Sequence, residues 1–314
     1  MASKNRELVG SVNPILTTFA TGYKLPGMIA DLVCPIVHSR TETGTFLGFG
    51  KEGFKIYNTE RALNANANQI HMANTHDTFK CIEHALETPI DYKLLKTEEA
   101  YGVKAITALK KRHHWLLSKA HMVKREYEVT NIIFNADYYA ADNKVSLSGD
   151  ACWSAKNTSD PLSDIASASE AVRSANGIMP NTLVLGMASW NALKVHPSLL
   201  GKITNQKNQF LTVNDLKEII NNNITKIIIG QGVYSDDSGT FYDLWDDKAA
   251  LLYTPSAEEM IEGCPLHSVQ IHQEGYPEVK EYAEKHVLTI EETQKRCVKN
   301  VDKTNGYLII NTVA

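Results

Sequence analysis

The chain has 314 residues, 43% of them hydrophobic and 22% charged, and a formal net charge of −4. These proportions match folded globular proteins and exclude a disordered or fibrous chain, while the length allows one composite fold or two domains. The 32 basic side chains are outnumbered by 36 acidic ones. The chain therefore lacks the basic excess typical of proteins that grip nucleic acid through its phosphates.

The first residues contain no apolar run of signal-peptide length, and no stretch of about 18 apolar residues could span a membrane. We therefore expect the chain to act in a cytoplasm. The five cysteines are odd in number, far apart and without a CxxC pair, which predicts reduced, mostly buried thiols. They are Cys34, Cys81, Cys152, Cys264 and Cys297.

Residues 1–40 interleave isolated apolar positions with glycines and prolines, so we expect no long regular element there and interpret the segment as an arm. Residues 41–76 contain four glycines, then alanine and asparagine in alternation, and few large apolar side chains. Such a composition predicts an extended loop or hairpin rather than part of a core.

The segment from Phe79 to Ile90 alternates as a strand does, and a long helix is predicted after it. Between Val103 and Phe134 there is no glycine or proline, and apolar residues recur three, four and seven positions apart, as on one helical face. At 1.5 Å per residue this helix would be about 45 Å long. That length is unusual in a compact domain and favours a role as a strut.

Strands and helices then alternate, which predicts an α/β layer. A helix is expected from Pro161 to Asn176, closed by Gly177. The elements expected after it are a strand at Asn181–Leu185, a helix at Ala188–Val195 ended by Pro197, a helix at Val213–Ile220 and a strand at Lys226–Ile229.

The remainder of the chain is predicted to be mostly strands. Short strands are expected at Leu244–Trp245 and Ala250–Thr254, with a break at Pro255. Residues 287–313 predict further strands, interrupted by a turn at Asn305–Gly306. The tryptophans beside the predicted elements are interpreted as core or interface anchors, not ligand-stacking residues: Trp153, Trp190 and Trp245.

The glycines of GFGKEG, Gly48, Gly50 and Gly53, satisfy GxGxxG, but neither a strand before them nor a packed helix after them is predicted. Gly230 and Gly232 follow a predicted strand, yet the next residues, VYSDDSGTFYDLW, predict a hairpin rather than a helix. GxSxG, P-loop and HExxH motifs are missing, so no catalytic, cofactor-binding or metal site is predicted. The histidines are interpreted as surface or interface groups: His84, His113, His114, His121 and His196.

Five segments together resemble the major capsid proteins of tailed bacteriophages, of the Hong Kong 97 type: GDACWSAKNTSDPLSDI, GIMPNTLVLGMASWNALKVHPSLL, ITKIIIGQGVY, DLWDDKAALLYTP and NGYLIINTV. The resemblance covers most of the chain from about residue 75 onward and lies in the order of packing motifs. It implies an α+β fold with an N-terminal arm, an extended loop, a peripheral domain containing a long spine helix, and an axial α/β domain. The implied boundaries are 1–40 for the arm, 41–76 for the loop, 77–155 with 265–314 for the peripheral domain, and 156–264 for the axial domain.

The resemblance also implies a function: pentamers and hexamers that form an icosahedral shell enclosing a phage DNA genome, with no enzymatic activity and no cofactor. Implied partners are other copies of the chain, a separate scaffolding protein, a portal and decoration proteins, with DNA enclosed without sequence-specific binding and no membrane involved. The chain would assemble in the host bacterial cytoplasm and reside in the virion capsid. The assembly loop would act through Phe46, Phe49, Lys51, Phe54, Lys55 and Tyr57.

Two alternatives stay open at this point. An encapsulin compartment would share the fold and enclose cargo proteins instead of DNA. A cytoplasmic nucleotide-binding α/β enzyme would use the glycines of GFGKEG.

Some capsid relatives cross-link their shells through a lysine and an asparagine, and Lys51 and Lys55 lie in the corresponding loop. Because no asparagine or assisting acid can be matched, that activity is not expected here.

Overall fold

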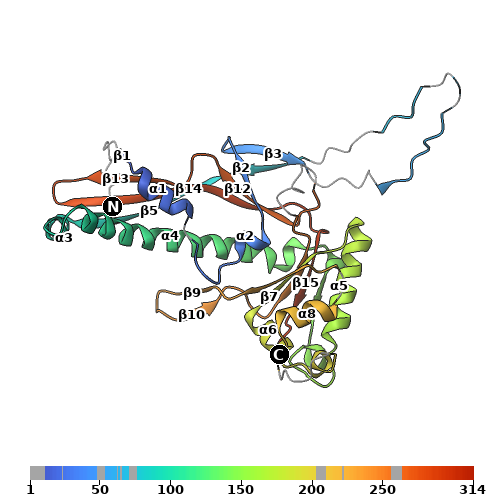
Figure 1. Cartoon of the computed structure of the whole chain (residues 1–314). Helices are drawn as coiled ribbons and strands as arrows, with labels where there is room; N and C mark the ends of the chain where they lie inside the picture. Colours follow the sequence, from blue (N-terminus) through green and yellow to red (C-terminus); the bar gives the residue numbers. More distant parts are fainter. Residues whose placement is uncertain are drawn as a thin grey trace.

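The computed structural model describes residues 11–22, 24–47, 54–61, 63, 66–70, 76–202, 210–220, 223–255 and 264–314. These residues form an L, with a long body and a shorter one that descends from one end of it (Figure 1). Helix α4 (Val103–Ile133) runs along the long body, and helix α5 (Pro161–Asn176) flanks the short one. The mixture of helices and sheets expected from the sequence is confirmed.

The long body is built on a six-stranded sheet, called here the long sheet. Its strands, in spatial order, are β1 (Ser11–Val12), β13 (Glu278–Ala283), β14 (Val287–Asn300), β12 (Ser268–Gln273) and β2 (Ile36–Ser39), and β5 (Ile82–Asp91) also pairs with β14. Every pairing is antiparallel except that of β12 with β2. The 14-residue strand β14 pairs with β5 over residues 287–296 and with β13 and β12 in succession, so it holds the sheet together.

Helix α4 lies along the long sheet because one of its faces is apolar. Its 31 residues include no glycine or proline, so nothing interrupts the helical hydrogen bonds. Leu109 and Leu117 are buried in one cluster with Val279 and Ile290 of the sheet. At 1.5 Å per residue the helix is about 45 Å long, as predicted.

The described part of the arm, residues 11–22 and 24–40, folds onto the long body of its own subunit. Its longest element is α1 (Pro14–Gly22), of nine residues, followed by the single turn α2 (Ala30–Val33). Strand β1 pairs with β13, strand β2 pairs with β12, and Leu16 of α1 is buried beneath α4. The expectation that residues 11–40 contain no long regular element is therefore confirmed for the part that is described.

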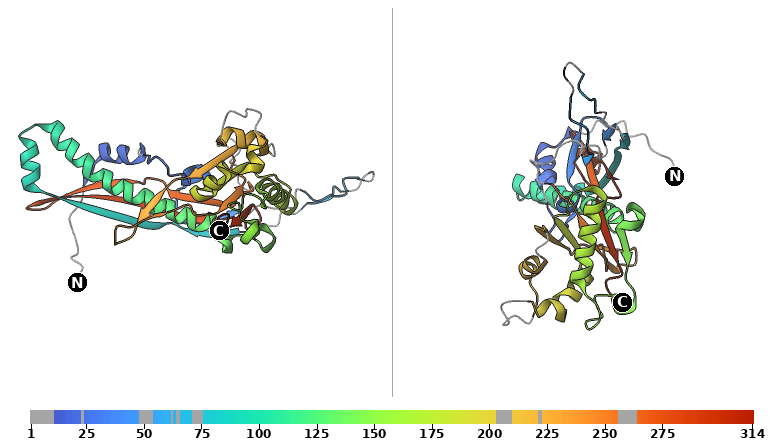
Figure 2. Two further views of the ribbon diagram at one scale, coloured as in Figure 1. Left: turned by 90° about the horizontal axis from the view of Figure 1, so that it is seen from below. Right: turned by 90° about the vertical axis from the view of Figure 1, so that its right-hand side faces the viewer.

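The segment after the arm begins and ends as the two strands of a hairpin, and its described residues between those strands project from the molecule. Strands β3 (Thr43–Leu47) and β4 (His76–Lys80) are antiparallel partners, with Thr43 opposite Lys80. Figures 1 and 2 show the described residues between these strands, 54–61, 63 and 66–70, lying away from the long body at the end opposite to α3 (Tyr92–Glu99). The predicted hairpin is confirmed.

The short body contains a five-stranded sheet, called here the short sheet, flanked by helices. Its strands, in spatial order, are β6 (Lys144–Ser146), β15 (Gly306–Ile310), β11 (Ala249–Leu252), β7 (Thr182–Gly186) and β8 (Lys226–Gly230). Strands β7 and β11 are buried along their whole length, which is why their sequences are continuous apolar runs. The helices are α5, α6 (Met187–Lys194), α7 (Pro197–Leu200) and α8 (Val213–Ile220).

The helix bounds in this body follow the capping signals. The side chain of Asp160 accepts a hydrogen bond from the backbone N–H of Ser163 at the start of α5, and Gly177 ends that helix with a φ of 79°.

The tryptophan interpretation is confirmed for burial, since the exposed fractions of Trp153, Trp190 and Trp245 are 0%, 8% and 0%. The cysteine prediction is confirmed as well, because all five are free and three are buried.

Three expectations differ from the structure. Leu244 and Trp245 form a bend after a strand, because Trp245 turns its indole into the core instead of pairing along a sheet edge. Pro197 does not only end a helix; it also begins α7, where proline at the first turn loses no hydrogen bond. Strands β6 and β15, which lie in the segments 77–155 and 265–314 expected to form the peripheral domain, pair within the short sheet. Apolar patterning identifies a strand but not its partner, so the exact domain boundaries stay a prediction.

Candidate assembly surfaces

The projecting loop carries large apolar side chains that its own subunit does not cover. Ile56 and Leu63 are fully exposed, at 102% and 95%, and Phe54 and Ile70 are more than half exposed. Monomeric proteins expose single apolar side chains, but several on one thin, extended segment indicate a surface that another molecule covers. The described part of the loop is therefore a candidate assembly surface.

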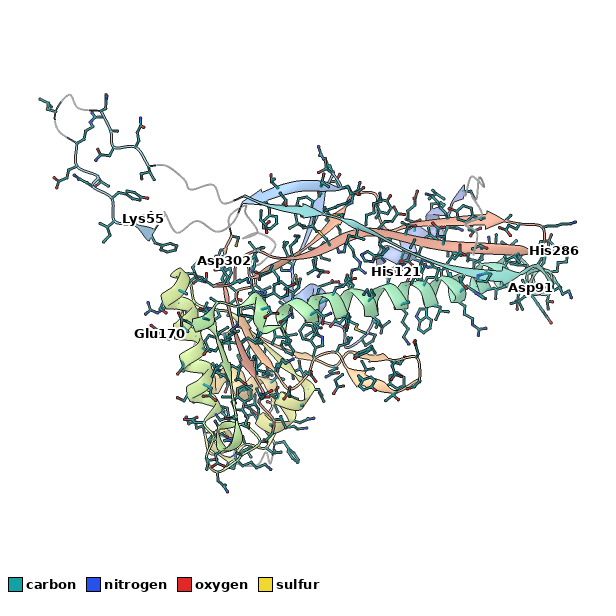
Figure 3. All side chains as sticks on the ribbon, turned by 180° about the vertical axis from the view of Figure 1, so that it is seen from behind. Lys55, Asp91, His121, Glu170, His286 and Asp302 are labelled. Atoms are coloured by element: carbon teal, nitrogen blue, oxygen red, sulfur yellow. The ribbon has the colours of Figure 1, made fainter. Side chains whose placement is uncertain are left out.

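The six residues predicted for this loop do not form one cluster. Phe46 belongs to the base of the hairpin, where it packs against the buried cluster of Phe79 and Cys81. Phe54 and Lys55 are exposed and Tyr57 is half-buried; Figure 3 shows Lys55 on the projecting segment. Phe49 and Lys51 lie outside the described residues, as does all of GFGKEG.

Among the described residues of the loop, Phe54 touches the short body. A Cβ placed on Gly177, at the end of α5, would lie 3.0 Å from Cε1 of Phe54, so the two residues are in contact. Within the loop, Nδ2 of Asn68 donates a 2.7 Å hydrogen bond to the carbonyl oxygen of Asn58, which joins its two halves. The loop is thus braced internally while Ile56 and Leu63 remain uncovered.

A second exposed apolar surface was not predicted. Strands β9 (Val233–Ser235) and β10 (Phe241–Asp243) form the expected hairpin beside α4, and Phe241 is 73% exposed. Tyr234 joins the hairpin to the helix, with ring centroids 5.8 Å from Tyr127 and 5.6 Å from Tyr242. A depression of about 740 Å³ separates hairpin and helix. The alternation of aromatic and polar residues in the hairpin is the signal that could have identified this surface.

The two bodies meet at a buried carboxylate. Glu126 of α4 is 1% exposed and accepts hydrogen bonds from the backbone N–H groups of Ile29, at 2.7 Å, and Ala30, at 2.8 Å. Its Oε1 also accepts a 2.6 Å hydrogen bond from Nε1 of Trp245. Burial raises the pKa of the Glu126 carboxyl, and these three donors oppose that effect. Sequence alone could not have found this role, because a glutamate on a polar-looking helix resembles a surface residue.

A second polar network joins α4 to β14 inside the long body. Oε2 of Glu292 lies 2.9 Å from Nε2 of His114 and accepts a 2.7 Å hydrogen bond from the Ser118 hydroxyl, and Oε1 accepts one from Nε2 of Gln294. The Nε2 of His121 is 3.2 Å from the carbonyl oxygen of Glu292. These polar contacts hold the helix against the sheet beside the apolar cluster of Leu109 and Leu117.

The surface interpretation of the histidines is wrong for three of the five. His114, His121 and His196 are buried, whereas His84 and His113 are half-buried. The physical reason is that each buried ring has polar partners; those of His196 are the hydroxyls of Ser159, at 3.1 Å, and Ser198, at 2.7 Å. Burial lowers the pKa of His121 and His196. Neutral, hydrogen-bonded imidazoles of this kind are structural groups.

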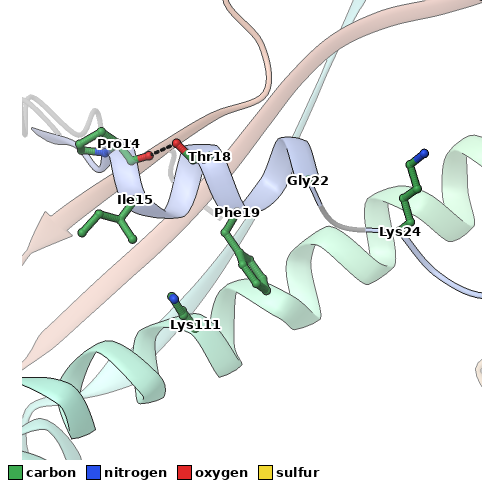
Figure 4. A pocket seen from close by; sticks show the side chains of 7 residues that line it. All are labelled: Pro14, Ile15, Thr18, Phe19, Gly22, Lys24 and Lys111. Atoms are coloured by element: carbon green, nitrogen blue, oxygen red, sulfur yellow. Dashed lines mark hydrogen bonds between the residues drawn. The ribbon is translucent and has the colours of Figure 1, made fainter.

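The arm contributes a shallow surface where α1 crosses α4. Figure 4 shows Phe19 pointing from α1 towards Lys111 of α4. The Nζ of Lys111 lies 5.8 Å from the centroid of the Phe19 ring, and the ring of His114 meets the same phenyl group edge-on at 5.8 Å. These contacts anchor the arm to the helix.

Within the ranges that the structure describes, no group of three or more metal-ligating side chains could hold a metal ion. No helix there is long and apolar enough to cross a bilayer.

Comparison with known proteins gives consistent results. The model of the family described as phage major capsid protein E matches residues 126–265. The major capsid protein of Burkholderia phage BcepMu is 32% identical over 302 residues, which cover 95% of this chain and 93% of that protein. The crystal structure of a phage-related protein from Bordetella bronchiseptica RB50 superimposes with a TM-score of 0.77 at 26% identity, covering 96% of this chain and 98% of the other. An encapsulin complex from Synechococcus elongatus has a TM-score of 0.53 at 10% identity, covering 99% and 96%.

Proposed function

The chain belongs to the phage major capsid proteins, and from this we propose that its copies form pentamers and hexamers that close into an icosahedral shell around a phage DNA genome. Its fold is the Hong Kong 97 type expected from the sequence. Members of this family are structural proteins, so the chain is not an enzyme and the nucleotide-binding alternative is set aside.

The observation that carries the proposal is the projecting loop. Burying a side chain such as Ile56 or Leu63 stabilises by about 1.5–3 kcal/mol, but each lies fully exposed in the single subunit. Ordering a backbone costs about 1–2 kcal/mol per residue. A neighbouring copy that covers these side chains offsets that cost, and a closed ring holds both partners at high effective concentration.

The charge of the chain supports DNA as the contents. With 36 acidic and 32 basic side chains, the wall is mildly negative and would not adhere to the phosphates packed against it. Enclosure would therefore be geometric and independent of DNA sequence. The encapsulin alternative has weaker support, because the similarity to an encapsulin is 10% in sequence and shows a shared fold alone, whereas the phage relative is 32% identical.

We further propose that a scaffolding protein, a portal and a decoration protein bind this shell, and that it assembles in the host cytoplasm before residing in the virion. The exposed aromatic side chains of the β9–β10 hairpin support such partners. Phe241 is 73% exposed and Tyr242 46%, so each offers apolar area that the subunit does not bury.

The test is assembly of the full chain, expressed with its scaffolding protein and examined by electron microscopy and sedimentation. The double variant Ile56→Thr with Leu63→Thr should keep the fold and yield far fewer closed shells. Ile82→Thr is the matched control, because Ile82 is 60% exposed but lies on strand β5. Shells formed equally well by the double variant would contradict the assembly role of the loop. Nucleic acid, rather than cargo protein, should be the content of shells purified from phage particles.

A further inference from the structure

A cavity of about 450 Å³ lies where the arm crosses the long body, next to the shallow surface between α1 and α4. Its walls come from the arm between α1 and β2, from helix α4, and from strands β12 and β14 of the long sheet. In Figure 3, His121 marks this region, on the side of α4 that faces the sheet. Elements distant in sequence build the cavity together, and neither the fold nor the proposed assembly explains its lining.

Basic side chains dominate the lining. Lys24, Arg125, Lys295 and Arg296 face the cavity, against the two carboxylates of Asp31 and Glu292. Nη2 of Arg125 is 3.0 Å from Oδ2 of Asp31, and the carboxylate of Glu292 is occupied by its partners on α4 and β14.

Lys295 and Arg296 are paired with carboxylates from outside the cavity. Lys295 reaches Glu42 and Glu83, at 3.4 Å each, and Arg296 pairs with Glu128. The outer carboxylates hold these side chains in place, while the lining itself keeps an excess of positive charge.

Several buried donors in this lining have no acceptor. Within the described part of the chain, Nη2 of Arg296, Nε of Arg125 and Nε2 of His272 lack any hydrogen-bond partner. Arg296 is only 1% exposed. A buried nitrogen donor without an acceptor is costly, so native proteins rarely leave one without water or a ligand. The two guanidinium nitrogens are fixed donors, and Nε2 of His272 is a third when it carries the ring proton, so together they indicate a missing acceptor with several oxygens.

We propose that this cavity binds a small multivalent oxyanion of the phosphate class. Guanidinium groups present planar pairs of N–H donors that match the spacing of phosphate oxygens. Arg125 on α4 and Arg296 on β14 approach the cavity from different elements, and His272 on β12 supplies a third nitrogen. The cavity, at about 450 Å³, is larger than one phosphate ion and leaves room for ordered water, which is usual in polar cavities.

The electrostatics at His272 agree with the proposal. Burial and the neighbouring charges of Arg125, Arg296 and His38 lower its pKa to about 3. Protonation of the His272 ring is therefore unfavourable in this cavity. The His272 ring lies 6.2 Å from that of His38, and Asp31 and Glu292 are the acids facing it across the cavity. A bound dianion would reverse the local field, so it should raise the pKa of His272.

The test is calorimetric titration of inorganic phosphate into the full chain at pH 7, at constant ionic strength with chloride as the background anion. We expect saturable binding that weakens about tenfold or more in Arg125→Gln, because one charge-assisted hydrogen-bond donor is lost. The matched control is Lys119→Gln, which removes one charge from the same helix on the face turned to the β9–β10 hairpin. That control should bind as the unaltered chain does.

A second readout keeps the proposal testable if Arg125→Gln folds poorly. Lys24→Gln removes an exposed cation at the rim and should also weaken binding. In proton NMR, phosphate should raise the pKa of the His272 ring, assigned with His272→Gln. Displacement of phosphate by short single-stranded DNA would identify a nucleic-acid backbone as the source of the oxyanion, and lack of displacement a free ion. No saturable binding above chloride, or equal binding by Arg125→Gln and Lys119→Gln, would overturn the site.

Discussion

The indole Nε1 of Trp245 donates a 2.6 Å hydrogen bond to Oε1 of Glu126, across 119 positions of sequence. Both residues are buried, and the same carboxylate accepts the backbone N–H groups of Ile29 and Ala30. One side chain of the spine helix therefore links the arm and the loop before β11. This contact fixes where the short body begins relative to the long one.

The first prediction concerns that carboxylate. Glu126→Ala leaves three buried donors without an acceptor, and because each costs about 1–3 kcal/mol, the free energy of unfolding should fall by about 3 kcal/mol or more. Glu126→Gln retains one acceptor oxygen and should lose less. Glu99→Ala, at an exposed position of α3, serves as the control. Urea denaturation measures all three, and an equal midpoint for Glu126→Ala and Glu99→Ala would contradict the role of the network.

The second prediction concerns the close approach of β8 to the same tryptophan. A Cβ on Gly230 would lie 2.1 Å from Cγ of Trp245, so Gly230→Ala must displace a fully buried indole. Overpacking of this kind costs about 1–3 kcal/mol, which thermal denaturation would detect. Gly22→Ala is the control, because nothing lies within 4 Å of its added carbon. The control should be neutral or slightly stabilising, and similar losses in both variants would refute the steric explanation.

The third prediction concerns acid stability. Burial lowers the pKa of His267 from 6.5 to about 4, so the folded protein resists a proton that the unfolded chain binds. Stability from this group is present above pH 6.5 and is lost as the pH falls towards 4, with about 2 kcal/mol lost between pH 7 and pH 5.

His267→Gln should therefore reduce the difference between urea midpoints measured at pH 7 and pH 5. His286→Gln, at the exposed end of the long sheet, should leave that difference unchanged. The same acid dependence in His267→Gln as in the unaltered chain would show that other groups cause it.

The fourth prediction concerns the loop. If a neighbouring subunit covers it, trypsin should cleave after Lys55 and Arg61 faster in free subunits than in closed shells, as read by mass spectrometry. Both residues are exposed in the single subunit. Lys51, which belongs to the same expectation, lies outside the described residues. Equal protection in the two states would mean that the loop packs on its own subunit, and its role in assembly would be withdrawn.

The sequence by itself determined the local elements. The bounds of α5 follow from Asp160, Pro161 and Gly177, because capping and the left-handed region act within a few residues. The long helix α4 could also be predicted from the sequence, because the spacing of its apolar residues and its lack of glycine and proline are local features. The projecting loop could be predicted for the opposite reason, its shortage of apolar side chains.

Only the tertiary structure decided which elements meet and what they bury. The sequence of strand β15 predicts an apolar strand but does not identify its partner; the structure pairs it with β11. Glu126 and Glu292 reveal nothing in sequence, because a carboxylate is buried only when donors converge on it from distant segments. The anion cavity exists for the same reason: Arg125, His272 and Arg296 become one site when a helix and two strands bring together charges that the chain keeps far apart.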